Sequence, residues 1–412
     1  GLGDGAIAVA GALDVDGAAG TLVNALSGAG TVNLMNSATV VATGDNSAFA
    51  GELATEKGTT LTVAQANHLG AAKLANDGKL IVNTSTDWTL ANAMTGTGDL
   101  IKDGAGALTA GDSLRHTGKT AVEAGTLIVG DAARPGVMLG ATDAGEVTVA
   151  EGATLAGLGT VNGHVTNAGE VAALNALSGH SSAAAGTFTL AGGLTNSGTV
   201  NLAGGQVGNQ LLVKGDYVGQ DGKLVLNTFM GDDNSATDKL VIDGGHASGQ
   251  TGMVIKQAGG SGAQTVSGIR VVQTLNGGTT DANAFALDGQ SDGYRASTGT
   301  IASGAYDYKL QRSGNGGQAQ DWYLVSTHNA PPVDPQEPSE PKKPKDVESP
   351  SVGKGETASP EPGAYLGNRQ AAMSLFHHTL HDRQGQAPGG YDANGQPVGD
   401  SNGWVRIVGS ES

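Results

Sequence analysis

The sequence predicts an all-β fold built as a solenoid, which is a long stack of thin layers. Short runs of alternating apolar residues recur along most of the chain and indicate strands. Turn residues separate these runs about every eight to twelve residues, a spacing typical of all-β proteins. The chain has 412 residues, of which 69 are glycine, 4% aromatic and 15% charged, so its apolar residues suit thin layers better than a thick core. A β-sandwich is the alternative architecture, and it would need more core aromatics and bulkier strands.

The charge and the cysteine content limit the function. The net charge of −17 argues against nucleic acid as a partner, because phosphate binding needs a basic surface. The absence of cysteine fits the cytosol, and it also fits export in an unfolded form, which an early disulfide would block. Residues 1–30 show no signal peptide, and no run of eighteen apolar residues predicts a membrane-spanning helix.

Residues 1–234 are predicted to form the rod of the solenoid. Turns of Gly, Asn or Asp alternate there with strands of three to five residues in a loosely recurring unit. Representative units are GTLVNALSGAGTVNL (20–34), GKLIVNTS (78–85), GTLIVG (125–130), GEVTVAEGATLAGLGTVNGHV (145–165) and GTVNLAGG (198–205). The segment from Val63 to Leu74 is Ala-rich and breaks the pattern, and we expect it to be a loop on the rod.

Residues 96–130 form the best single unit, and this unit resembles the passenger-associated repeat of autotransporters. The matching positions are Gly96, Gly98, Leu100, Lys102, Gly104, Gly106, Leu108, Thr109, Gly118, Thr120, Gly125, Thr126 and Leu127. Where that family usually has an Asn and an aromatic residue, this chain has Leu114, Arg115 and His116, so we expect the outward loop of this rung to be atypical.

The repeat also predicts which side chains point inward. Leu100, Leu108, Val122 and Leu127 would stack on the rungs above and below, while glycines turn the corners. At roughly 20–25 residues a rung, residues 1–326 would give on the order of 13–16 rungs. Because the open end of such a stack is an unpaired edge, the end must be capped.

Residues 235–326 are predicted to provide that cap. Short strands and Gly-rich turns follow one another here, and aromatic residues are dense. The order of the strands resembles the C-terminal end of a pertactin-like autotransporter passenger, where the family's autochaperone region caps the β-helix and starts its folding. The residues assigned to this folding seed and cap are Asp238, Leu240, Val241, Gly244, Gly249, Tyr306, Tyr308, Leu310, Trp322 and Leu324.

The composition changes after residue 326. Residues 327–363 hold nine of the twelve prolines and are predicted to be an extended, disordered linker. Residues 364–384 carry Leu366, Met373, Phe376 and Leu380 on one face of a predicted short helix. Residues 385–412 end in GWVRIVGSES, which resembles the first strand of an autotransporter barrel, so the helix would line the pore of a truncated barrel.

Three groups of residues resemble chemical sites. Gly118-Lys119-Thr120 is similar to the end of a phosphate loop, but position 113 is serine where the motif needs glycine, so a solenoid turn is preferred. His377 and His381 share a helix face and could hold a metal, although polar residues lining a pore explain them better. An acidic run could supply calcium ligands, although turn residues on a solvated edge explain it better; it comprises Asp232, Asp233, Asn234, Asp238 and Asp243. We therefore predict no catalytic residue, no cofactor and no metal.

The resemblance implies a right-handed parallel β-helix displayed by a Gram-negative bacterium through type V secretion. The implied partners are the protein's own outer-membrane β-barrel, the outer-membrane assembly machinery, and host-cell or extracellular-matrix ligands. The implied location is the outer membrane and cell surface, with release of the passenger outside the cell as an alternative. The expected role is adhesion without enzymatic activity. Two alternatives stay open, a stalk that presents an N-terminal protease or lipase domain lying before Gly1 and a free β-helical polysaccharide lyase. Both ends of a longer precursor would be missing.

Overall fold

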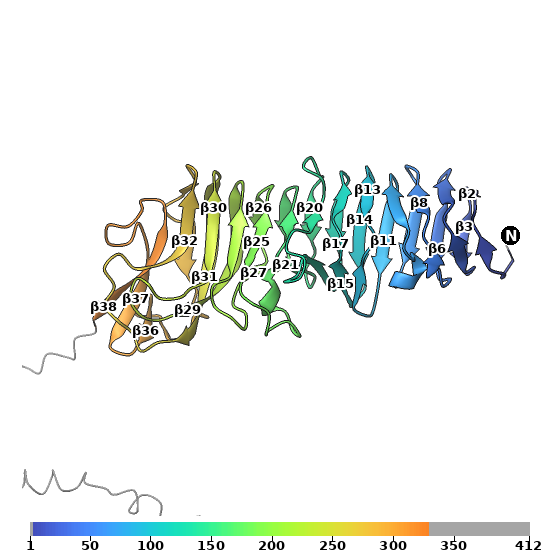
Figure 1. The fold of residues 1–412 in the computed structure, drawn as a ribbon. Coiled ribbons are helices and arrows are strands. Elements are labelled where there is room, and N and C mark those ends of the chain that lie inside the picture. The colour runs from blue at the N-terminus through green and yellow to red at the C-terminus, as the bar shows by residue number, and fades with distance from the viewer. Residues whose placement is uncertain (1–2, 329–412) are drawn as a thin grey trace, which may run out of the picture. The chain divides into compact units, whose positions relative to one another are not determined.

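A computed structural model describes residues 3–328 of the chain. These residues lie within one compact unit, Gly1–Asp334, and form a parallel β-solenoid with hardly any helix. In most turns the chain contributes one strand to each of three faces. The turns stack in chain order (Figure 1). No helix of residues 3–328 is long and apolar enough to cross a membrane. The predicted linker, pore helix and barrel strand, with His377 and His381, lie outside the described residues.

Twelve parallel strands form the first face. They are β2 (Ala12–Asp16), β5 (Thr31–Met35), β8 (Glu52–Thr55), β10 (Lys73–Asn76), β13 (Met94–Gly96), β16 (Leu114–His116), β19 (Met138–Leu139), β22 (Thr160–Val161), β25 (Thr187–Leu190), β28 (Gln210–Val213), β30 (Lys239–Asp243) and β32 (Ile269–Leu275).

The second face follows the same order one corner later. Its strands are β3 (Ala19–Leu22), β6 (Thr39–Ala42), β9 (Thr60–Val63), β11 (Lys79–Asn83), β14 (Asp99–Asp103), β17 (Thr120–Val122), β20 (Val147–Val149), β23 (Val165–Asn167), β26 (Leu194–Asn196), β29 (Tyr217–Phe229), β31 (His246–Gly259) and β33 (Thr279–Thr280).

The third face is interrupted once. Its first part is β1 (Ile7–Ala8), β4 (Leu26–Gly28) and β7 (Ala48–Phe49), and in the next turn the 3-10 helix η1 (Ala66–His68) replaces a strand. The face resumes with β12 (Trp88–Leu90), β15 (Ala107–Ala110), β18 (Thr126–Val129), β21 (Thr154–Gly157), β24 (Glu170–Ala173), β27 (Thr199–Asn201) and β34 (Phe285–Leu287); a second 3-10 helix, η2 (Leu174–Ala176), follows β24. The expected loop at 63–74 is therefore a short helix between two strand ends.

The two long strands β29 and β31 run through both the second and the third face. Residues 217–219 of β29 pair with β26, and residues 223–225 pair with β27, so the strand passes the corner without stopping. The register shifts between Gln220 and Gly222, and Asp221 at the shift has φ +59°. This bulge bends the strand at the corner.

The length of a turn increases toward the C-terminus. Asn33 pairs with Asp14 of the preceding turn, which lies 19 residues earlier in the chain. Thr279 pairs with His246 of the preceding turn, which lies 33 residues earlier in the chain. The twelve strands of the first face are therefore fewer than the 13–16 rungs expected from a uniform repeat.

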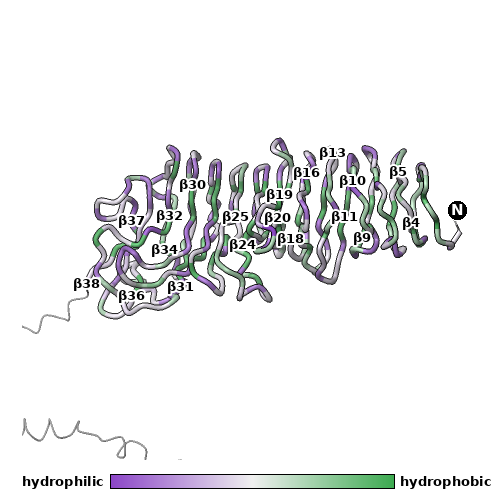
Figure 2. The backbone as a smooth tube through the Cα atoms, viewed as in Figure 1, coloured by the Kyte–Doolittle hydropathy of each residue, from purple (hydrophilic) through white to green (hydrophobic). Residues whose placement is uncertain are grey.

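The core is a continuous aliphatic column inside the three faces. Alternate residues of each strand point inward, and Leu100, Leu108, Val122 and Leu127 are fully buried, as predicted. Figure 2 shows hydrophobic residues along the strands and hydrophilic residues at many of the turns that join them. Glycines at corners allow close stacking of rungs: a Cβ on Gly118 would collide with the carbonyl oxygen of Gly98 in the preceding turn.

Candidate functional site

The end of the solenoid is closed by a small antiparallel sheet. Strands β36 (Thr300–Ser303), β37 (Tyr306–Arg312) and β38 (Trp322–His328) follow the short β35 (Tyr294–Arg295), and β38 pairs antiparallel with β32, the last strand of the first face. In Figure 1 this sheet lies at the end of the stack opposite the N-terminus. The change of strand direction ends the parallel stack, because the new sheet occupies the edge of β32. We call residues 294–328 the cap.

Aromatic side chains join the cap to the last turns. The Trp322 ring meets Phe285 edge to face at a centroid distance of 5.5 Å, and Phe285 lies 5.8 Å from Tyr217. Leu324 pairs with Ile269 of β32 and is fully buried, and Leu310 is also buried in the same cluster. Together these side chains cover the C-terminal end of the aliphatic column.

Thr280, which the sequence analysis did not single out, is the polar hub beneath Trp322. Its hydroxyl accepts hydrogen bonds from Trp322 Nε1 and Arg312 Nε, both at 3.1 Å, and donates to the Gln320 carbonyl at 2.8 Å. Its backbone N–H donates to Gln320 Oε1 at 2.9 Å. One buried threonine thus ties both flanks of the β37–β38 turn to β33.

Asp321 is a second contact that the sequence analysis missed. This carboxylate is buried, and its Oδ1 accepts hydrogen bonds from the Thr274 N–H at 2.8 Å and the Thr274 hydroxyl at 2.7 Å. Arg270 Nη1 lies 3.4 Å from Asp321 Oδ2. Asp321 therefore fixes the start of β38 to β32.

Tyr308 spans the interior of the cap. Its hydroxyl donates to the Gly231 carbonyl at 2.8 Å and accepts from the Ala263 N–H at 2.9 Å, and burial raises the pKa of the phenol. Tyr306, two residues earlier in β37, is half-buried, and its ring meets the His328 ring edge to face at a centroid distance of 5.2 Å. Because they are two residues apart in one strand, both tyrosines lie on the same side of β37.

Asp238 lies at a corner and is completely buried. Its Oδ1 accepts hydrogen bonds from the Gly208 and Asn209 N–H groups, both at 2.8 Å, and its Oδ2 accepts from the Asn227 N–H at 2.7 Å. Burial raises the pKa of the Asp238 carboxyl to about 6, against the opposing effect of these three hydrogen bonds. The interpretation of Asp238 as a turn residue on a solvated edge is wrong, because its carboxylate connects consecutive turns inside the stack.

The other predicted seed residues before the cap lie in β30, in the turn that follows it and in β31. Leu240 points into the aliphatic column, whereas Val241 points outward and is nonetheless buried. Gly244 and Gly249 have φ of +75° and +76°, in the left-handed region that favours glycine. Gly249 also lies against the Gly219 backbone, where a Cβ would collide with a carbonyl oxygen.

In the acidic loop that precedes Asp238, a carboxylate accepts hydrogen bonds from backbone N–H groups. Asp233 accepts hydrogen bonds from the N–H groups of Val266, Ser267 and Gly268 at 2.8–3.0 Å. These bonds lower the pKa of Asp233 despite partial burial, so the loop carries a stable negative charge. No group of three His, Cys, Asp or Glu side chains within residues 3–328 is placed to hold a metal ion.

The repeat at 96–130 differs from expectation at one place. Leu114, Arg115 and His116 form strand β16, with Leu114 and His116 buried, so they are not an outward loop. Lys102, the lysine of the repeat, is also fully buried. Its Nζ donates to three backbone carbonyls, of Asp103, Gly104 and Ala124, at 2.7–3.0 Å.

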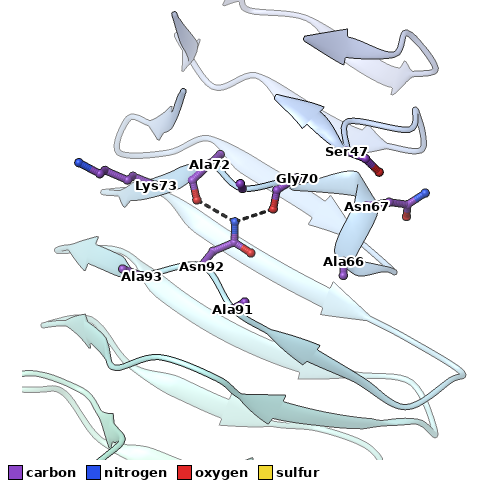
Figure 3. Close-up of a pocket in the computed structure, with 10 residues that line it drawn as sticks. Ser47, Ala66, Asn67, Gly70, Ala72, Lys73, Ala91, Asn92 and Ala93 are labelled. Carbon is purple, nitrogen blue, oxygen red and sulfur yellow. Dashed lines mark hydrogen bonds between the residues drawn. The ribbon is translucent and has the colours of Figure 1, made fainter. Parts of the chain in front are cut away.

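A shallow hollow of about 520 Å³ lies where η1 interrupts the third face. Figure 3 shows Asn92 in its wall, with Nδ2 donating to the carbonyls of Gly70 at 3.1 Å and Ala72 at 2.7 Å. Its lining also includes five alanines, Ser47, Asn67 and Lys73. The Asn92 side chain thus fastens its own turn to the preceding turn at this corner.

Comparison with known proteins finds a family match over the last turns and the start of the cap. Residues 191–310 match the model of the Autochaperone Domain Type 1 family, which overlaps the predicted autochaperone region over residues 235–310. The chain is also similar to the adhesin BmaC autotransporter of Brucella suis, with 30% identity across 93% of this chain and 10% of that protein. The described chain is part of an autotransporter passenger. The predicted resemblance is thereby confirmed.

Two further relatives match the passenger over long stretches. An uncharacterized protein, YuaQ of Escherichia coli K12, is 36% identical over 85% of the passenger chain and 21% of its own length. The autotransporter adhesin AIDA-I of Escherichia coli is 31% identical over 50% of the passenger chain and 13% of its own length. The passenger chain thus spans about a fifth or less of these three relatives.

Proposed function

We propose that this passenger is an adhesion-type rod of a Gram-negative cell surface, and that its C-terminal turns and cap seed its folding during export. The observation that carries the proposal is the antiparallel cap on β32, next to turns that match an autochaperone family model. The partners in this proposal are the protein's own outer-membrane barrel and the machinery that assembles such barrels.

The geometry supports a seed at the capped end. Each parallel strand pairs only with the strands one turn before and after it, so stability propagates between nearest neighbours. An isolated turn exposes two unpaired edges, whereas the last turn is covered on one side by the cap. The capped turn is therefore the first that can present a stable edge to its neighbour.

The role outside the cell is proposed to be binding without catalysis. Two of the similar proteins are named as adhesins, and the hollow beside η1 lacks an acid–base pair. Host-cell or extracellular-matrix ligands are the proposed targets. Release from the surface is a further proposal, which a cell-fraction assay of the exported passenger would test.

The seed proposal is tested by refolding the chain from urea while backbone amides are labelled with deuterium in short pulses. We expect β28, β30, β32 and β38 to gain protection before β2, β5 and β8. A Trp322→Ala variant should slow the appearance of all protection. The matched variant Leu34→Ala, in a buried position of β5, should lower stability without slowing the C-terminal turns. Protection that begins in β2–β8 would contradict the proposal.

A further inference from the structure

A polar path runs through the interior of the solenoid at the corner between the second and third faces. It begins at Asn167, whose Nδ2 donates to Asn196 Oδ1 at 2.8 Å in the next turn. It continues at Tyr217, one turn after Asn196, and the Asn196 side chain is a polar neighbour of the Tyr217 hydroxyl. The same hydroxyl lies 2.9 Å from Thr251 Oγ1, which belongs to the following turn. All four side chains are buried, so the path crosses four consecutive turns without solvent.

The path occupies an inward position that is aliphatic in the two turns just before it. In the preceding turns the same inward position holds Val122 and Val149, and in the following turns it holds Gly219 and Gly249. A Cβ on Gly219 would collide with Thr251 Oγ1, so the missing side chain makes room for the path. The large Tyr217 is likewise paired in register with the small Ala247.

Aliphatic stacking alone discriminates weakly between registers. Val147 pairs with Val165, and the inward residue two positions later in β20 is Val149, so a shift of two residues would still place Val165 over an aliphatic side chain. A shift of two residues moves a strand by about 6–7 Å relative to its neighbour. Tyr217 and Thr251 would then lose their contact, and two buried hydroxyls would have no partner, which is strongly unfavourable.

We propose that Asn196, Tyr217 and Thr251 are positioning residues that set the register between the turns of the C-terminal half. This role goes beyond seeding, because a seed determines where stacking starts and the polar path determines how each turn is aligned. The apolar column supplies the stability, and the polar path excludes the shifted alternatives. These side chains therefore act on the adjacent turn of the same chain.

The chain has no cysteine, so engineered cysteine pairs can report register without background. Val218 and Ser248 pair directly on the outer surface of β29 and β31. In the native register their Cα atoms are separated by about one strand spacing, roughly 4.8 Å, which a disulfide can bridge. Val218 is about 8 Å from Gln250 and from His246, too far for a disulfide unless the strands shift by two residues. V218C/S248C therefore reports the native register, and V218C/Q250C and V218C/H246C report the two shifts.

The test compares these pairs in the parent chain and in an N196L/Y217F/T251V chain, each refolded while reduced and then oxidised at low concentration. We expect only the native pair to cross-link in the parent. In the apolar variant a shifted pair should cross-link about fivefold more than in the parent, with a matching loss at the native pair. The control T148V/T199V removes two outward hydroxyls, in β20 and β27, that have no hydrogen-bond partner within residues 3–328, and it should leave all yields unchanged.

Unchanged cross-link ratios in the apolar variant would overturn the proposal. If the triple variant does not refold, Y217F alone decides, because it removes a single hydroxyl; a rise in shifted cross-links supports the role and no rise overturns it. The measurement is made on refolded chains at equilibrium. A negative cross-linking result would not change the proposed order of folding. Likewise, the pulse-labelling result does not bear on the register proposal.

Discussion

The Asp238 carboxylate combines three hydrogen bonds with complete burial and no paired cation among the described residues. The backbone N–H groups favour its charged form, and the loss of hydration favours its neutral form. The loss of hydration prevails and raises the pKa to about 6. Since an unfolded aspartate titrates near 4, the folded chain binds this proton more tightly than the unfolded chain.

The sign of the resulting pH dependence follows directly. The contribution of Asp238 to stability is fully present below about pH 4 and is lost as the pH rises through about 6. Between pH 7 and pH 5 it should raise the free energy of unfolding by about 1 kcal/mol. Urea unfolding of the parent and of the non-titrating Asp238→Asn chain checks this, and parallel pH profiles for the two chains would refute it.

Thr280 allows a test with a matched pair of substitutions. Thr280→Val removes the hydroxyl that serves Trp322 Nε1, Arg312 Nε and the Gln320 carbonyl, and leaves these groups without that partner. We expect a loss of about 2 kcal/mol in the free energy of unfolding. Thr280→Ser keeps the hydroxyl and should cost less than about 1 kcal/mol. Equal losses for the two chains, measured by urea unfolding, would mean that the methyl group rather than the hydrogen bonds matters.

At the scale of strands, the contacts at a corner determine how well a glycine there tolerates substitution. Gly244 and Gly249 share nearly the same φ, but only Gly249 lies against the backbone of the preceding turn. Gly244→Ala should therefore cost only the strain of a positive φ, about 1 kcal/mol. Gly249→Ala adds a collision with the Gly219 carbonyl and should cost at least about 3 kcal/mol. Thermal unfolding of both chains distinguishes them, and similar losses would show that β29 and β31 yield at this corner.

Strands of the rod could be predicted from the sequence because their signal is local and periodic. Leu100, Leu108, Val122 and Leu127 belong to short strands bounded by turn residues, and all four point inward. The contacts that fasten the cap could not be predicted in this way. Thr280 and Trp322 are 42 residues apart, and no spacing rule links a threonine in one strand to an indole in another.

Two misinterpretations have the same origin. Asp238 belongs to a run of acidic residues, and composition alone indicates a solvated turn, whereas the fold carries only this member of the run into a corner. Residues 114–116 differ from the repeat's usual pattern, yet Leu114 and His116 still alternate as a strand requires. In both cases the periodic position of the residue was more informative than its chemical type.

For the described unit as a whole, the nearest-neighbour architecture makes the two ends unequal. Removing residues 1–77 takes away complete turns but leaves every contact of the cap, so the urea midpoint of the remaining turns should change little. Removing residues 294–412 uncovers β32 and the Phe285–Tyr217 pair and should lower the midpoint clearly. Circular dichroism during urea unfolding measures both, and equal effects would contradict a stack that depends on its cap.

The direction of the hydrogen bonds between turns has a mechanical consequence. In a parallel solenoid these bonds run along the stack, so a force that pulls the N-terminus away from the cap loads one turn at a time. Such a stack should peel under tension, with short steps at first and longer steps near the cap, because Asp14 and Asn33 are 19 residues apart whereas His246 and Thr279 are 33 residues apart. Single-molecule stretching would record this as a staircase of growing steps. The stack would then lengthen turn by turn before its cap is disturbed.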